Sequence, residues 1–121
     1  KNLFLRNQRG DRHYLVIVMH TKRTDLRSLA AQIGDGKLSF ASPDRLQTHL
    51  GVEPGAVSPF GLMADTSHRV QVFIDRELRR APRVTFHPNV NTATLVVTFS
   101  DLECFLADSG HPVRFIEVTA A

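Results

Sequence analysis

The sequence contains a single cysteine and no apolar run long enough to cross a membrane. Because Cys104 has no second cysteine to pair with, an internal disulfide is excluded, and a reducing, cytoplasmic setting fits best. No stretch approaches the roughly 20 apolar residues that a membrane-spanning helix needs. No signal-peptide pattern opens the chain either. These absences predict a cytoplasmic domain with no membrane partner.

The motifs of several enzyme classes are absent as well. None of the six histidines forms H-x-x-x-H or stands at metal-ligand spacing from the cysteine, so no metal site is expected. Neither the G-x-S-x-G motif of serine hydrolases nor the G-x-x-x-x-G-K phosphate loop occurs. Cys104 lies among apolar neighbours in a predicted helix, which indicates an inert core thiol. The carboxylates are scattered, so no acid–base pair can be nominated.

Length and charge bound the protein without identifying it. A chain of 121 residues, 42% apolar and 22% charged, is typical of one globular domain with a single core. Fifteen Lys and Arg against twelve Asp and Glu leave a net charge of +3, which suits a polyanionic partner but does not require one. The only local basic cluster is "DRELRRAPR", residues 75–83, and a solvated surface segment is its simplest interpretation.

Capping and turn signals divide the chain into short strands and helices. Strands are expected at 2–5, 13–19, 37–41, 60–64, 69–75, 92–99 and 113–118. Helices are expected to begin at the caps Thr24, Ser42 and Ser100 and to end at Gly34, Gly51 and Gly110. His13, at the edge of a strand, is expected to be solvated. Consecutive strands can form hairpins, so we predict an α/β fold of the α+β kind. Its sheet would be mixed, largely antiparallel and barrel-like, with helices around it.

Two loops carry the polar or backbone groups that suggest a site. In "TFHPNVNTATLVV", His87 and Asn91 stand directly before an apolar stretch that is expected to be a buried strand. The histidine could serve a site or equally brace the loop. In "GAVSPFG", Gly55 precedes small residues and a proline, so backbone N–H groups of the loop could form a nest for a carbonyl or oxyanion. A plain connecting loop is the alternative.

Four motifs together resemble a known family. They are "KNLFL" at 1–5, "KLSFASPDRL" at 37–46, "LGVEPGAVSPFGL" at 50–62 and "FHPNVNTATL" at 86–95. In order and spacing they resemble the bacterial prolyl-tRNA editing-domain superfamily, and most of all its free-standing alanyl-tRNA(Pro) deacylases. The resemblance covers the entire chain and implies one editing domain over residues 1–121. Members usually carry some tens of residues before the lysine motif, so an N-terminal segment is expected to be missing here.

The resemblance also implies a set of site residues. The family's essential lysine falls on Lys1, and its histidine near the late strand falls on His87; both are expected to be catalytic. The substrate-binding set it implies consists of Asn2, Gly55, Ala56, Val57, Ser58, Pro59 and Asn91. No metal and no cofactor are implied.

The function implied is trans-editing, the hydrolysis of mischarged alanyl-tRNA(Pro) in translation quality control. The expected partners are mischarged tRNA(Pro) and, beside it, prolyl-tRNA synthetase or an elongation factor, with neither DNA nor a membrane involved. A non-catalytic tRNA-binding or synthetase-associated module is the main alternative. A deacylase for another small aminoacyl group, cysteine or serine, is a further one.

Overall fold

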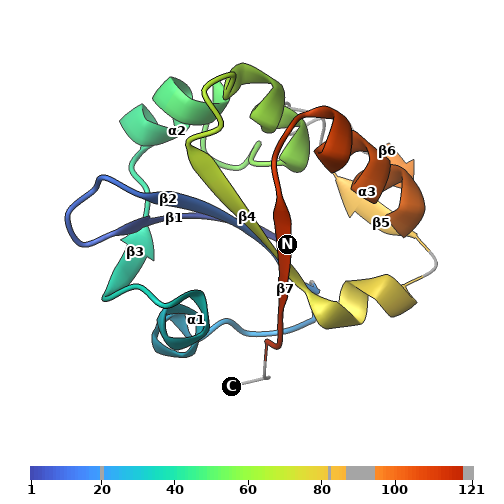
Figure 1. Ribbon diagram of the computed structural model, residues 1–121, viewed down its shortest axis with the longest axis horizontal. Coiled ribbons are helices and arrows are strands. Elements are labelled where there is room, and N and C mark those ends of the chain that lie inside the picture. Colours follow the sequence, from blue (N-terminus) through green and yellow to red (C-terminus); the bar gives the residue numbers. More distant parts are fainter. Residues whose placement is uncertain (20, 82, 87–94, 119–121) are drawn as a thin grey trace.

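A computed structural model places a mixed five-stranded sheet at the centre of the protein (Figure 1). It describes residues 1–19, 21–81, 83–86 and 95–118. The strands run in the order β3 (Leu38–Phe40), β1 (Asn2–Asn7), β2 (His13–Ile17), β4 (Val70–Asp75) and β7 (Val113–Ile116). Strand β1 is antiparallel to β2 and β3, whereas β4 is parallel to β2 and β7. A second, antiparallel pair consists of β5 (Val84–Phe86) and β6 (Leu95–Val97). The predicted mixed sheet surrounded by helices is confirmed.

Helices cover both faces of the central sheet (Figure 1). They are α1 (Leu26–Ile33), α2 (Pro43–Leu50), α3 (Phe99–Asp108) and the 3₁₀ helices η1 (Pro59–Ala64) and η2 (Arg76–Arg80). Helix α1 packs on one face, where Leu29 joins Val16 and Phe73. The other helices and β5 pack on the opposite face through Leu50 and Leu102 among others. Within the described residues, no helix is long and apolar enough to span a bilayer.

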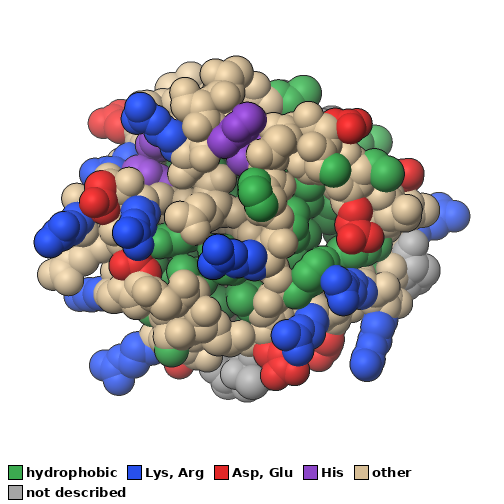
Figure 2. All heavy atoms as spheres, viewed as in Figure 1, with side chains coloured by type: hydrophobic (Ala, Val, Ile, Leu, Met, Phe, Trp, Pro, Cys, Tyr) green, Lys and Arg blue, Asp and Glu red, His purple; other side chains and the backbone are tan. Residues whose placement is uncertain are grey.

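The alternation of side chains along the strands explains why the sheet is covered on both sides. Successive residues of a strand point to opposite faces, so a continuous apolar strand needs a core on each side. All five residues of β2 are buried: Leu15 and Ile17 belong to one core, and Tyr14 and Val16 to the other. Lys and Arg side chains are spread over the surface outside these cores (Figure 2).

Caps set the helix boundaries, but only some of them are the predicted ones. Helix α1 ends at Gly34 as predicted, but its N-cap is Asp25 instead of Thr24, with the Asp25 side chain accepting from the Arg27 amide. In α2 the hydroxyl of Ser42 accepts from the amide of Arg45 at 3.3 Å, and Gly51 ends the helix at a φ of 66°. In α3 the cap is Thr98 instead of Ser100, and its hydroxyl accepts from the Asp101 amide at 3.1 Å. The helix therefore begins earlier than expected, at Phe99.

Several strand and burial predictions are wrong. Residues 60–64 form the 3₁₀ helix η1, because the Ser58 side chain caps its first turn and Pro59 suits the first helical position. The strand expected at 92–99 is described only at Leu95–Val97, and Thr98 ends it as the cap of α3. This strand is not buried, since Leu95 is 39% and Val96 50% exposed. Cys104 is exposed on α3 and not in the core.

His13 is buried, 4% exposed, where solvation was expected. Its ring packs against Phe4, with centroids 5.6 Å apart, and against His49, with centroids 4.0 Å apart. Nη1 of Arg45 lies 3.0 Å from its Nε2, so the ring accepts a hydrogen bond there and is neutral. Burial, followed by the nearby charges of His49 and Arg45, lowers the pKa of His13 from 6.5 to about 4.

A second buried histidine lies near the same end of the sheet, since His13 pairs with Val70 and the Val70 amide donates to the carboxylate that His111 contacts. His111 Nε2 lies 2.9 Å from Asp65 Oδ2, and its Nδ1 lies 2.9 Å from Ser109 Oγ. The same carboxylate accepts from the amides of Arg69 and Val70. Burial acts to raise the pKa of Asp65, but these hydrogen bonds outweigh it and lower the pKa. The Ser109 hydroxyl donates to a carbonyl and His111 is 2% exposed, so this Ser–His–Asp group joins loops and is not a nucleophile.

The depressed pKa of His13 makes stability depend on pH. The unfolded chain binds a proton at His13 below pH 6.5, whereas the folded protein binds it only near pH 4. The contribution of the neutral His13 ring to the free energy of unfolding is therefore fully present above pH 6.5 and is lost as the pH falls toward 4. His13→Gln, which keeps an acceptor without a titrating ring, should flatten this loss in urea unfolding measured across that window. An NMR titration in which the wild-type His13 ring ionises near its ordinary pKa would contradict this account.

Candidate functional site

A cavity of about 650 Å³ opens at one end of the β1–β2 hairpin. Three segments enclose it: the ends of β1 and β2, the loop at Gly55, and the chain from η2 into β5. Its described lining consists of Lys1, Asn2, Ile17, Val18, Met19, Gly55, Val57, Leu78, Ala81, Arg83, Val84 and Thr85. Four of the residues expected to form a site are therefore brought together from positions more than 50 residues apart. The wall is mostly apolar, with a few polar groups, as in small-molecule sites generally.

The hairpin register positions Lys1 and Asn2 at the cavity. Asn2 pairs with Ile17 at the last step of the antiparallel ladder, and the Val18 amide donates to the Lys1 carbonyl at 2.8 Å. Lys1 is thereby held at the rim by its backbone. The side-chain ammonium group of Lys1, at Nζ, donates to the carbonyl of Lys22. An ammonium has three N–H donors, so two remain to face a ligand.

Asn2 carries an unpaired acceptor. Its side-chain Oδ1 is buried and accepts no hydrogen bond from any described residue. Leaving a buried acceptor unpaired costs roughly 1–3 kcal/mol, and proteins seldom retain one without a reason. Asn2 lines the cavity, so a small turn of its side chain would bring this shielded oxygen to a ligand with an N–H or O–H donor.

The Gly55–Pro59 loop divides between cavity wall and support. Gly55 and Val57 line the cavity, whereas Ala56, Ser58 and Pro59 are buried behind it. The Ala56 amide donates to the Glu53 carbonyl at 3.0 Å, and Ser58 and Pro59 start η1. Within this loop, only the amides of Gly55 and Val57 therefore remain as candidates for the expected nest. Among the described residues, no backbone carbonyl accepts from the amide of Gly55 or Val57.

Gly55 is needed for its backbone conformation. Its φ is 89°, in the region that L side chains rarely adopt, and a Cβ there would meet nothing within 4 Å. A side chain at this position would strain the backbone and would not clash with the protein. The open space beside Gly55 also lets a ligand approach the main chain closely.

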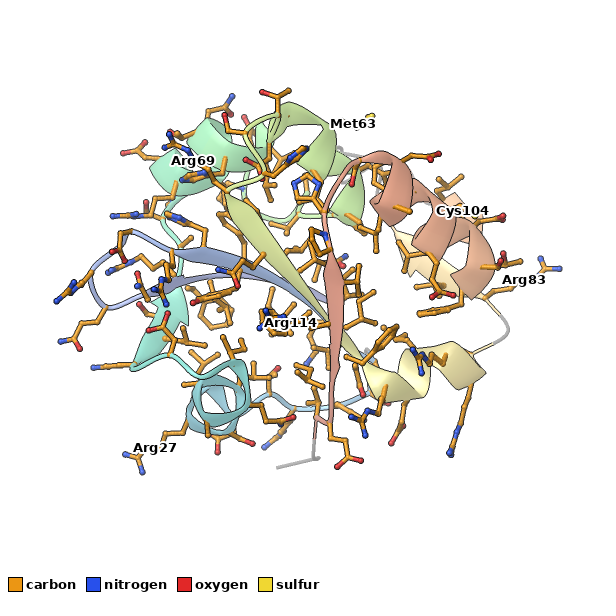
Figure 3. All side chains as sticks on the ribbon, in the orientation of Figure 1. Arg27, Met63, Arg69, Arg83, Cys104 and Arg114 are labelled. Carbon is orange, nitrogen blue, oxygen red and sulfur yellow. The ribbon has the colours of Figure 1, made fainter. Side chains whose placement is uncertain are left out.

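The chain from η2 into β5 was not expected in the site. Leu78 and Val84 supply apolar wall, and Thr85 adds a hydroxyl. Arg83 also lines the cavity, and its guanidinium extends away from the body of the protein at the η2–β5 end (Figure 3). The sequence signal for this segment is the basic cluster at residues 75–83, whose simplest interpretation from the sequence is a solvated surface segment. His87 and Asn91 follow β5 in the sequence and lie outside the described residues.

The charges around the cavity favour an anion and supply no general base. Of the described lining residues, Lys1 and Arg83 are cationic, and none is a carboxylate or a histidine. In the part of the chain that the structure describes, no group of three or more His, Cys, Asp or Glu is arranged to hold a metal ion. The arrangement can therefore bind a phosphate or stabilise a developing oxyanion. A water to be activated there would need its base from the substrate or from residues beyond those described.

Comparisons with known proteins point to one family. The model of the aminoacyl-tRNA editing domain matches residues 1–105. The prolyl-tRNA editing protein ProX of Acetoanaerobium sticklandii is 45% identical over 118 residues, which cover 98% of this chain and 72% of that protein. Prolyl-tRNA synthetase associated domain-containing protein 1 of Danio rerio is 35% identical over 113 residues, covering 92% of this chain and 61% of its own length. The crystal structure of a candidate trans-editing enzyme for prolyl-tRNA synthetase has the same fold. It has a TM-score of 0.72 at 22% identity and covers 100% of this chain and 69% of its own.

The unpaired oxygen of Asn2 leads to a test of stability. Asn2→Leu replaces the amide by an apolar group of similar shape, so we expect the free energy of unfolding to be unchanged or to rise by about 1 kcal/mol. Urea denaturation without ligand measures this. Asn2→Asp is the matched control, because it keeps the shape but buries a charge, and it should lower stability. A clear loss of stability in Asn2→Leu would mean that the amide serves the fold instead of a ligand.

Proposed function

Since the chain belongs to the aminoacyl-tRNA editing domain family, we propose that it is a trans-editing deacylase that hydrolyses mischarged alanyl-tRNA(Pro). The observation that carries this proposal is the single cavity that joins Lys1, Asn2, Gly55 and Val57. Its cationic rim suits the phosphate of a tRNA 3′ end, and its apolar wall suits a small side chain. The partners proposed are mischarged tRNA(Pro) and, beside it, prolyl-tRNA synthetase or an elongation factor.

The reaction requires little covalent chemistry from the protein. A water oxygen bonds to the acyl carbon and gives up one proton, which later goes to the leaving ribose oxygen, and the former carbonyl oxygen takes the negative charge. The bond from the acyl carbon to the terminal ribose oxygen then breaks. The ribose oxygen takes up a proton, and the free amino acid and uncharged tRNA leave. An ester is already activated, so positioning of the water and stabilisation of the oxyanion account for most of the acceleration.

Four residues at the cavity have roles in this scheme. Lys1 binds the terminal phosphate or the oxyanion with the donors that its contact to Lys22 leaves over. Asn2 accepts from the substrate's ammonium group or ribose hydroxyl through its unpaired Oδ1. The amides of Gly55 and Val57 fix the acyl carbonyl. Because no described lining residue is a base, we assign the orientation of the water to the free hydroxyl of the terminal adenosine.

Two expected residues keep proposed roles that rest on the resemblance alone. We propose that His87 positions substrate or water and that Asn91 contacts the substrate at the mouth of the site. Ala56, Ser58 and Pro59 hold the loop in place from behind, through the contact to Glu53 and the start of η1. Their contribution to substrate binding is then indirect.

A second candidate function is supported by one comparison. The Danio rerio relative is named for association with prolyl-tRNA synthetase, which fits a binding module without hydrolysis. A cavity that contains the lysine and a loop with an open glycine favours the enzyme. A deacylase for cysteine or serine differs from the first proposal only in the side chain that the wall admits.

Deacylation of a panel of mischarged tRNA(Pro) species tests the proposal. Alanyl-tRNA(Pro) should be hydrolysed faster than cysteinyl-, seryl- or prolyl-tRNA(Pro). Lys1→Ala should reduce the rate by roughly 10²-fold, as expected for a lost oxyanion or positioning contact. Lys37→Ala, at an exposed lysine away from the cavity, is the matched control and should keep the wild-type rate. An absence of hydrolysis with every substrate, together with retained tRNA binding, would favour the binding module.

Val57 should set the upper size of the side chain that is admitted. Its side chain lines the cavity, so Val57→Ala widens the wall and should raise cleavage of prolyl- relative to alanyl-tRNA(Pro) by about tenfold. Val113→Ala is the matched control, because Val113 packs against the same core but does not line the cavity. An unchanged ratio in Val57→Ala would place the discrimination elsewhere.

A further inference from the structure

The positive charge of this protein is concentrated beside the proposed site. A second cavity of about 560 Å³ adjoins η2, lined by Lys22, Asp75, Arg76, Glu77, Arg79, Arg80, Glu117 and Val118. Helix η2 lies between the two cavities, because Leu78 lines the first and its neighbours line the second. The linings of the two cavities taken together contain six cations and three carboxylates, a net charge of +3. That equals the formal net charge of the whole chain.

The acidic side chains of this region are already engaged. The Lys22 ammonium lies 2.9 Å from Asp75 Oδ2 and 3.2 Å from Glu77 Oε1. Glu117 lies 3.6 Å from Arg76. These pairs neutralise the carboxylates locally. The cations they leave over are Arg79, Arg80 and Arg83, in addition to Lys1.

Arg80 and Arg83 are the cations with the greatest freedom to bind a partner. Both are exposed, and no described residue forms an ion pair or hydrogen bond with either. Arg79 differs, because its guanidinium lies over the Phe115 ring, 3.6 Å from the centroid. Lys and Arg side chains are visible along the η2 side of the molecule (Figure 2), and Arg83 stands at its edge (Figure 3).

We propose that Arg80 and Arg83, on the segment that leads from η2 into the cavity, bind the phosphate backbone of the tRNA acceptor end. This inference rests on the proposed function, since it takes the 3′ end to enter the cavity lined by Lys1. A strand whose last nucleotide lies in that cavity must leave over its rim. Arg83 lines the first cavity, and Arg80, three residues earlier in the chain, lines the second. Guanidinium groups bind phosphates in two-pronged geometry, and such contacts position the nucleic acid without reading its sequence.

The salt dependence of tRNA binding tests this surface apart from catalysis. Each phosphate contact releases counterions, so the slope of log affinity against log salt concentration falls by about 1 for each arginine lost. Binding of uncharged tRNA(Pro), labelled at its 5′ end, would be followed by fluorescence anisotropy over a range of NaCl concentrations. Arg80→Ala should lower the magnitude of the slope by about 1, and Arg80→Ala/Arg83→Ala by about 2.

Two controls separate this surface from general charge and from misfolding. Arg80→Lys/Arg83→Lys keeps the charges and should keep most of the slope. Arg27→Ala removes an exposed arginine on α1, far from Arg83 in the view of Figure 3, and should leave the slope unchanged. Thermal unfolding confirms that each variant is folded.

The outcomes are distinguishable from those of the proposed function. A wild-type slope in the double alanine variant would overturn the assignment of this surface to RNA, whatever the rate of deacylation. A lost slope in a protein that hydrolyses no aminoacyl-tRNA would support the surface and reject the deacylase. Equal loss of slope in Arg27→Ala and in Arg80→Ala would also overturn the proposal, because it would reduce the effect to net charge.

Discussion

The fold depends on the burial of β2 on both faces and its pairing along both edges. Antiparallel pairing to β1 and parallel pairing to β4 leave its main chain fully used within the sheet. The strand ends at Ile17, and this residue and the two that follow it, Val18 and Met19, line the cavity. The proposed site thus begins at the end of the β1–β2 ladder. Lys1 and Asn2 owe their positions to that strand and not to a loop of their own.

Among the described residues, the cavity is lined by positioning groups and by no carboxylate or histidine. Lys1, Asn2, Gly55 and Val57 meet there beside an apolar wall. Groups of this kind accelerate a reaction by holding the substrate and one attacking water in position and by excluding other water molecules. An already activated ester is the kind of substrate that such groups suffice for.

The sequence correctly predicted features that depend only on neighbouring residues, such as the ends of α2. The Ser42 cap and the Gly51 end of α2 are properties of a few neighbouring residues, and both are confirmed. Burial of His13 and exposure of Cys104 depend on which distant elements pack nearby, so a reading of neighbours alone assigned both wrongly. For the site, the family resemblance supplied four of the residues that share the cavity, Lys1, Asn2, Gly55 and Val57. It did not supply Arg83, because only the path of η2 into β5 brings that residue to the rim.

The two parallel pairings also bear on the order in which the chain can fold. The β1–β2 hairpin forms from contacts close in sequence, but the second edge of β2 stays unpaired until β4 arrives, since His13 pairs with Val70. Strand β7 comes later still, with Val113 opposite Val72. Contacts this distant close large loops and slow folding. During synthesis, more than 50 residues separate the end of β2 from the start of β4, so one edge of the hairpin stays unpaired while they are made. An unpaired strand edge is a site where partly folded chains can aggregate.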